Sequence, residues 1–186
     1  MNEALFVTLL PAGFLTLLFR GGALFRRQNV DQDGEPPIDK GIFLTSKYCI
    51  LLVWAITVLH SWGISPSFLR VPALFKWPAL VLWGLGFALL FAGRLGLGSS
   101  FRLGSPREQT RLTVGGLFRI SRNPMYLGVY STLLASVLYT LSPLVLIVGA
   151  FVAVVHHRIV LAEERYLRSV FGPEYAMYCS RVGRYL

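Results

Sequence analysis

Residues 125–155 read MYLGVYSTLLASVLYTLSPLVLIVGAFVAVV, which is two apolar runs interrupted by Ser142 and Pro143. Proline fits the first turn of a helix, where its missing N–H costs nothing, so this interruption marks a helix start. The stretch therefore predicts a helical hairpin, with helices over Met125–Leu141 and Leu144–Val155. The second run has only twelve residues, or about 18 Å of helix. We expect that it extends past Val155 or that the hairpin tip stops inside the membrane.

Three further apolar runs precede the hairpin, at Ala4–Phe19, Tyr48–Ile64 and Trp77–Leu97. Each approaches the roughly 20 residues that a helix needs to cross about 30 Å of hydrocarbon. The first run lacks a basic leader and a small-residue cleavage site, so we interpret it as a retained span and not as a signal peptide. The sequence predicts an all-α, multi-pass transmembrane protein with about five helical spans.

The composition agrees with a bilayer as solvent. Hydrophobic residues make up 54% of the chain, and the mean hydropathy is +0.58, which is too apolar for an ordinary soluble protein. The net charge of +9 comes from basic residues that flank apolar runs, so we expect a membrane partner and no nucleic acid. Cys49 and Cys179 form no paired motif, and neither a disulfide framework nor a metal site is expected.

The basic residues also predict an orientation. Only Arg70 and Lys76 lie between the second and third runs, whereas many more follow the first, third and fifth runs. Because basic loops stay on the cytoplasmic side, the N-terminus should be outside and the C-terminus inside. Any chemistry should then occur on the cytosolic face. The residues that follow the three runs are Arg20, Arg26, Arg27 and Lys40; Arg94, Arg102, Arg107, Arg111, Arg119 and Arg122; and Arg158, Arg165, Arg168, Arg181 and Arg184.

A first candidate segment, residues 110–126, reads TRLTVGGLFRISRNPMY and is a polar, glycine-bearing loop before the hairpin. Such a loop can hold a polar ligand against the membrane. Asn123 and Pro124 also have a purely structural interpretation, as an N-cap that accepts from the first turn and a first helical residue. Arg122 would then be an anchor at the lipid headgroups. Both interpretations remain open on spacing alone.

A second candidate segment, His156–Tyr178, continues from the last apolar run as a charged amphipathic helix. Glu164 and Arg168 are four residues apart, which predicts a surface salt pair. Glu163 shares its helix stripe with apolar neighbours near the bilayer, so it is either a site residue or a side chain exposed to headgroup water.

Gly172 and Pro173 should end this helix and start a short terminal one. That terminal helix carries Tyr175 and Tyr178, as interfacial anchors or as catalysts. His156 and His157 are adjacent, so their side chains diverge and form no metal pair. Gly93, Gly96 and Gly98 fit close helix packing better than a ligand site.

Together the two segments resemble the isoprenylcysteine carboxyl methyltransferase and phospholipid methyltransferase superfamily of membrane enzymes. That superfamily has a loop L-V-x-x-G-x-Y, then R-H-P-x-Y opening a helical hairpin, then E-E followed by F-G-x-x-Y-x-x-Y. The counterparts here are Leu112–Phe118, Arg122–Tyr126, Glu163–Glu164 and Phe171–Tyr178, in the same order. The resemblance covers roughly the C-terminal half of the chain.

The resemblance implies a cofactor, S-adenosylmethionine, in a pocket walled by the loop, the hairpin start and the glutamate helix. Arg122 or Arg158 would face an anionic group of the substrate as catalytic residues. This chain has Ile159 where the superfamily has a substrate-facing arginine, and Phe118 replaces a tyrosine. Asn123 replaces a histidine and cannot take a proton near neutral pH, so no general base is expected there. The cofactor-binding residues implied are Thr110, Leu112, Thr113, Phe118, Asn123, Pro124, Met125, Tyr126, Glu163 and Glu164.

A chain of 186 residues fits one domain, so we expect one membrane domain over residues 1–186. Residues 1–97 would supply three spans, and residues 98–186 the cofactor-binding loop, the hairpin and the terminal helices. The expected activity is methyl transfer to a lipophilic or lipidated acceptor, whose reactive group is a prenylcysteine carboxylate, a phospholipid amine or a thiol. Two alternatives remain: a non-enzymatic assembly or lipid-binding protein, and a membrane reductase that uses a nicotinamide cofactor.

Overall fold

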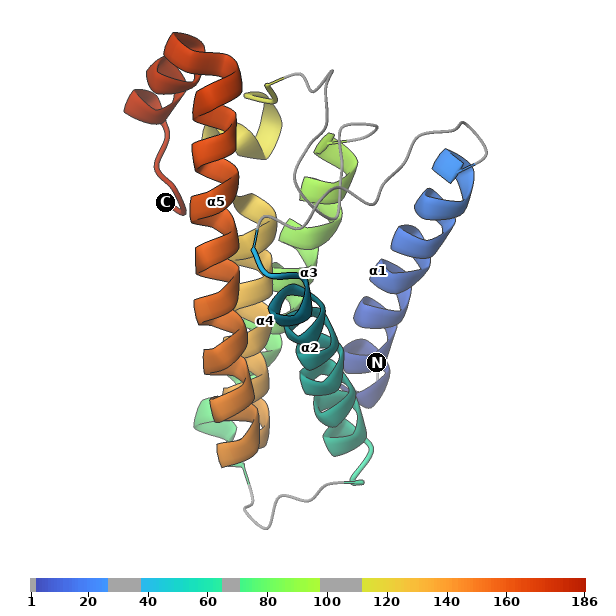
Figure 1. The fold of residues 1–186 in the computed structure, drawn as a ribbon. Helices are drawn as coiled ribbons and strands as arrows, with labels where there is room; N and C mark the ends of the chain where they lie inside the picture. Colours follow the sequence, from blue (N-terminus) through green and yellow to red (C-terminus); the bar gives the residue numbers. More distant parts are fainter. Residues whose placement is uncertain (1–2, 27–37, 65–70, 98–111) are drawn as a thin grey trace.

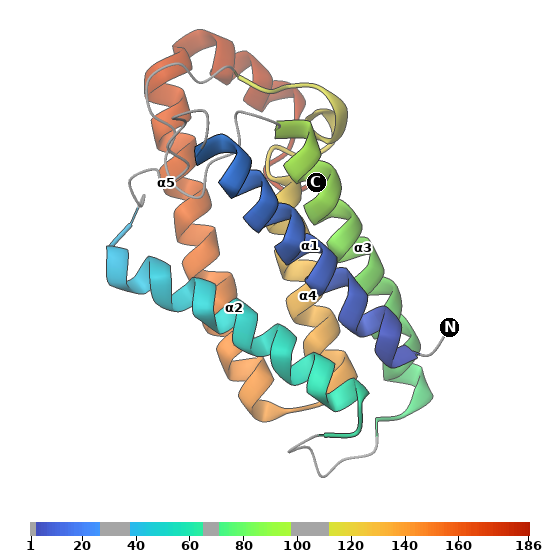
Figure 2. The ribbon, with the colours of Figure 1, turned by 90° about the vertical axis from the view of Figure 1, so that its right-hand side faces the viewer.

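The computed structural model describes residues 3–26, 38–64, 71–97 and 112–186, with the backbone alone for residues 21–26. The described residues are helical and contain no strand, which confirms the all-α prediction. Figures 1 and 2 show long helices running side by side as a bundle. The elements are α1 (Glu3–Arg26), α2 (Lys40–Ser61), α3 (Ala73–Leu97), the 3₁₀ turn η2 (Gly116–Arg119), α4 (Pro124–Thr140) and α5 (Pro143–Arg181).

The helix lengths fit a membrane protein. Within the described residues, α1, α2, α3 and α5 are long and apolar enough to cross a bilayer. Helix α4 has 17 residues, or about 25 Å at 1.5 Å per residue, which is slightly less than the hydrocarbon thickness. It contacts α3 along its length and also packs against α5 and α2.

The predicted hairpin is present. Helix α4 ends at Thr140, and the following residue, Leu141, has a positive φ of 45° that reverses the chain. Ser142 then precedes Pro143 at the start of α5. Helix α5 does extend past Val155 and reaches Arg181. Its straight part, up to residue 171, is roughly 43 Å long, so it projects beyond the hydrocarbon.

Helix α5 bends at Gly172, as predicted. Gly172 has φ 47° and ψ −119°, a conformation that a residue with a Cβ adopts at a cost. Pro173 then begins a second helical stretch, Pro173–Arg181, which we call the terminal segment. Figures 1 and 2 show this segment folding over the end of the bundle.

Helices α3 and α4 approach each other closely at a pair of glycines. A Cβ added to Gly128 would lie 2.7 Å from the carbonyl oxygen of Gly86, and a Cβ added to Gly86 would lie 2.9 Å from that of Gly128. Small residues let backbones touch, and close packing is the main force between helices in lipid. Of the glycines expected to serve this purpose, Gly93 packs against Met125, and residue 98 lies outside the described residues.

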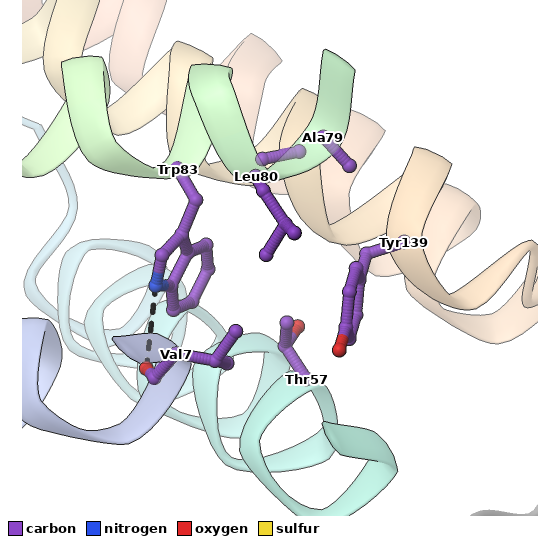
Figure 3. Close-up of a pocket in the computed structure, with 7 residues that line it drawn as sticks. Val7, Thr57, Ala79, Leu80, Trp83 and Tyr139 are labelled. Atoms are coloured by element: carbon purple, nitrogen blue, oxygen red, sulfur yellow. Dashed lines mark hydrogen bonds between the residues drawn. The ribbon is translucent and has the colours of Figure 1, made fainter. Parts of the chain in front are cut away.

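The middle of the bundle is filled by side chains. Trp83 and Phe87 are fully buried, and their ring centroids are 5.0 Å apart. Trp83 Nε1 also donates to the carbonyl oxygen of Val7 at 3.2 Å, beside a hollow between α1, α2, α3 and α4 that is drawn in Figure 3. The volume of this hollow is close to 0 Å³, so it has no room for a ligand.

The hairpin end of the bundle is held by a polar cluster around Glu3. Glu3 pairs with Lys76 of α3 at 2.6 Å and accepts a hydrogen bond from Tyr139 of α4 at 2.6 Å. The ring of His60 meets Tyr139 edge-on, with centroids 5.5 Å apart. The start of α1 is therefore tied to α3 and α4.

Candidate functional site

The two candidate segments meet at the end of the bundle opposite the hairpin tip. Turn η2, the first turn of α4, the second half of α5 and the last residues of the chain lie together there, as Figures 1 and 2 show. The predicted site residues therefore gather at one end, except that Thr110 lies outside the described residues.

Tyr126 and Glu163 are in direct contact. The Tyr126 hydroxyl donates to Glu163 Oε1 at 2.8 Å, which joins the first turn of α4 to the middle of α5. Both side chains are partly buried. No hydrogen bond from a described residue reaches Glu163 Oε2. The two residues can therefore touch one small ligand, as the resemblance requires.

Glu164 forms a different contact, and the prediction of a surface pair with Arg168 is wrong. Glu164 is only 7% exposed and lies 3.2 Å from Arg122 Nη1. It also accepts two hydrogen bonds from Arg184, from Nε at 3.0 Å and from Nη2 at 2.8 Å. This helix face points toward α4 and the end of the chain, so these arginines are nearer than Arg168. Hydrogen bonding to the carboxylate raises the pKa of the Arg184 guanidinium.

The two predicted catalytic arginines differ in environment. Arg122 is mostly buried, and its Nη1 lies 2.7 Å from Cys179 Sγ as well as next to Glu164. Its Nε is buried and has no hydrogen-bond partner in the described part of the chain. Arg158 is exposed. Ile159, at the position of the superfamily arginine, is buried at 1% exposure against Phe43 and Val155.

The prediction that Asn123 is an N-cap is correct for its position and wrong for its hydrogen bond. Asn123 does occupy the N-cap position before Pro124, but its side chain makes no capping hydrogen bond. Its Nδ2 donates to the carbonyl oxygen of Arg184 at 3.1 Å instead. The side chain binds there because the last residues of the chain cross the start of α4.

Residues 182–186 line one side of the site, and the sequence did not predict this position. The backbone N–H of Arg122 donates to the carbonyl oxygen of Gly183 at 3.0 Å. Tyr185 lies against α4 and α5, with its hydroxyl 2.8 Å from His157 Nδ1 and 3.3 Å from the Tyr130 hydroxyl. Nothing in the motif spacing marks these residues as neighbours of the loop, since the contacts depend on the bend at Gly172.

The loop before α4 is anchored by the terminal segment. Phe118 is buried, and its carbonyl oxygen accepts from the Tyr178 hydroxyl at 2.6 Å. Tyr175 and Tyr178 are themselves buried, in a cluster with Val182 and Leu112, so they are packing residues of this contact and not interfacial anchors. Thr113 is partly buried on the same loop.

A groove of about 470 Å³ runs between this loop and the terminal segment. Its size is in the range of small-molecule sites. Apolar side chains lie beside two arginines and one glutamate, so the groove offers both a surface for a flat ring and charged groups. The lining residues are Leu112, Val114, Arg119, Glu174, Met177, Tyr178, Arg181 and Val182.

Helix α2 contributes a wall on the other side of Tyr126. Phe43 is buried with Val155 and Ile159, and Tyr126 packs against this cluster. Lys47 Nζ lies 3.9 Å above the Phe43 ring and acts electrostatically on Glu163. The sequence gives no signal for either residue, because a single aromatic and a single lysine in an apolar helix match no motif. Among the described residues, no three His, Cys, Asp or Glu side chains form a group that could hold a metal ion.

Comparison with known proteins identifies the family of the chain. No curated protein matches the chain. The sequence profile of the family described as Phospholipid methyltransferase matches residues 75–174, which is more than half of the chain and contains α4, the hairpin tip, the glutamate pair and the bend at Gly172. The chain belongs to the phospholipid methyltransferase family.

Proposed function

We propose that this protein transfers the methyl group of S-adenosylmethionine to an acceptor dissolved in the membrane. The observation that carries the proposal is the contact between Tyr126 and Glu163, which joins the hairpin start to the glutamate helix at one polar end of an apolar bundle. Membership in the phospholipid methyltransferase family supports methyl transfer as the reaction.

The residues present fit this cofactor chemically. Its sulfonium and ammonium groups are cationic, and Glu163 has a carboxylate oxygen that no described residue engages. Its carboxylate is anionic, and Arg122 Nε is a buried donor with no partner in the described residues. The groove beside Leu112 and Tyr178 has the volume and the apolar surface for a nucleoside.

The sulfonium supplies an activated methyl group, so the protein needs mainly to orient the reactants and exclude water. Tyr126 holds the Glu163 carboxylate in place, and residues 182–186 close the site on one side through Asn123. The acceptor would enter from the lipid between helices, since its reactive group must reach a cofactor that arrives from water.

Calorimetric titration of the detergent-solubilised protein with S-adenosylmethionine tests the proposal. Glu163→Gln removes the negative charge, and we expect binding at least about tenfold weaker. Tyr126→Phe removes the donor that holds Glu163, and we expect a smaller loss in the same direction.

Tyr48→Phe is the matched control, because Tyr48 is 68% exposed on α2 and should leave the affinity unchanged. Absence of heat with the wild-type protein, for both S-adenosylmethionine and its demethylated product, would refute the cofactor assignment. A melting temperature raised by NADPH and not by S-adenosylmethionine would favour the reductase instead.

A further inference from the structure

His156 is a buried imidazole with one nitrogen committed to the backbone. It is 7% exposed, and its Nδ1 lies 2.9 Å from the carbonyl oxygen of Val152. A carbonyl oxygen only accepts, so Nδ1 carries the hydrogen and Nε2 carries the lone pair. Among the described residues, no hydrogen bond reaches Nε2. The backbone contact therefore fixes the tautomer that is able to take up a proton.

The imidazole also lies beside the site. The Tyr126 ring meets it edge-on, with centroids 5.9 Å apart, and the hydroxyl of the same tyrosine binds Glu163. His156 precedes Glu163 by two helical turns, which places it roughly 10 Å closer to the hairpin tip. An acceptor that enters from the lipid would meet His156 on the membrane side of the cofactor.

Other groups near Tyr126 are less suited to accept a proton. Asn123 is an amide and donates to Arg184. Cys179 is engaged by Arg122, and Glu163 Oε1 already accepts from Tyr126. The Nδ1 of His157 is bound to Tyr185, on another face of α5.

We propose that His156 Nε2 is the general base of the methyl transfer and that the acceptor carries a proton on the attacked atom, as an amine or a thiol does and a carboxylate does not. This inference rests on the proposed function. The acceptor lone pair forms the new bond to the methyl carbon, and the sulfur–methyl bond breaks with its electron pair going to sulfur. The N–H or S–H proton passes to Nε2 and is then released to water.

The test is radiolabelled methyl transfer by the full chain in nanodiscs of total polar lipid extract, measured as kcat against pH. In the wild type we expect an inflection from the imidazole, and in His156→Gln a kcat at least about 100-fold lower without that inflection. His60→Gln is the matched control, because His60 lies against Tyr139 at the opposite end of the bundle, and it should keep the wild-type profile. The charged and titratable groups that act on or contact His156 in the described residues are Lys47 on α2 and Tyr126 on α4, and both are unchanged in both variants.

Binding of S-adenosylmethionine by His156→Gln separates the two proposals, and we expect it within about twofold of wild type. Absence of S-adenosylmethionine binding by the wild-type protein would refute the proposed function. If His156→Gln binds S-adenosylmethionine and keeps the wild-type dependence of kcat on pH, the assignment of His156 as the general base is refuted. Should that variant not fold, the wild-type product decides: label on nitrogen or sulfur supports the base, and label on a carboxylate, or no label at all, overturns it.

Discussion

Glu163 and Glu164 are adjacent in the chain, yet their side chains have different environments. Consecutive helical residues point about 100° apart, so Glu163 meets Tyr126 while Glu164 meets Arg122 and Arg184. One carboxylate has an oxygen left for a ligand, and the other has both oxygens bound by arginines. At the scale of single residues, the first is suited to binding and the second to holding α5, the loop and the chain end together.

We expect Glu164→Gln to lower the free energy of unfolding by about 3 kcal/mol, because two arginines next to a buried site would lose their counter-charge. Thermal or denaturant unfolding in detergent measures this. Glu174→Gln is the control, since Glu174 is exposed and its change should stay within about 0.5 kcal/mol. Equal stability of the two variants would show that the Glu164 cluster does not hold this end of the bundle.

At the scale of helices, the crossing of α3 and α4 sets the position of the site. Gly86 and Gly128 allow the two backbones to touch, and Gly128 lies only half a turn after Tyr126 on α4. A wider crossing would move the first turn of α4, and Tyr126 with it, relative to α5. The interhelix contact and the Tyr126–Glu163 hydrogen bond should therefore be lost together.

Gly128→Leu tests this coupling, because its side chain would overlap the Gly86 backbone. We expect a loss of about 1–3 kcal/mol of unfolding free energy together with weaker binding of S-adenosylmethionine. Gly96→Ala is the control on α3: its Cβ would lie 3.8 Å from the Phe118 ring, an ordinary contact. A Gly128→Leu protein with wild-type stability would contradict the close crossing.

At the scale of the whole molecule, both the charge distribution and the fold distinguish the two ends of the bundle. The hairpin tip and the end of α2 lie at one end, and the candidate site lies at the other, as Figure 1 shows. More lysine and arginine residues flank the helix ends on the site side than those on the hairpin side. This asymmetry predicts that the site end faces the cytosol.

Cysteine labelling of intact cells tests that orientation, in a background with Cys49→Ala and Cys179→Ser. We expect a membrane-impermeant maleimide to label Trp62→Cys and to leave Arg168→Cys unlabelled until the cells are opened. Both positions are exposed, so access to the reagent depends on the side of the membrane. The reverse pattern would place the site outside.

Much of the fold was predictable from the sequence because its determinants are local. Apolar runs of sufficient length, the Ser142–Pro143 interruption and the Gly172–Pro173 break depend on neighbouring residues, and each led to the element observed. The resemblance in motif order likewise indicated the family and singled out Tyr126 and Glu163 before their contact was known.

The partners of each polar side chain depended on the tertiary structure. Glu164 has a basic residue four positions away, yet it binds Arg184, and Asn123 has a helix to cap, yet it binds the last residues of the chain. Phe43 and Lys47 belong to no motif, but the packing of α2 against α5 brings them to the site. Hydropathy and turn chemistry are properties of adjacent residues, whereas these contacts require the relative rotation of packed helices, which local sequence does not specify.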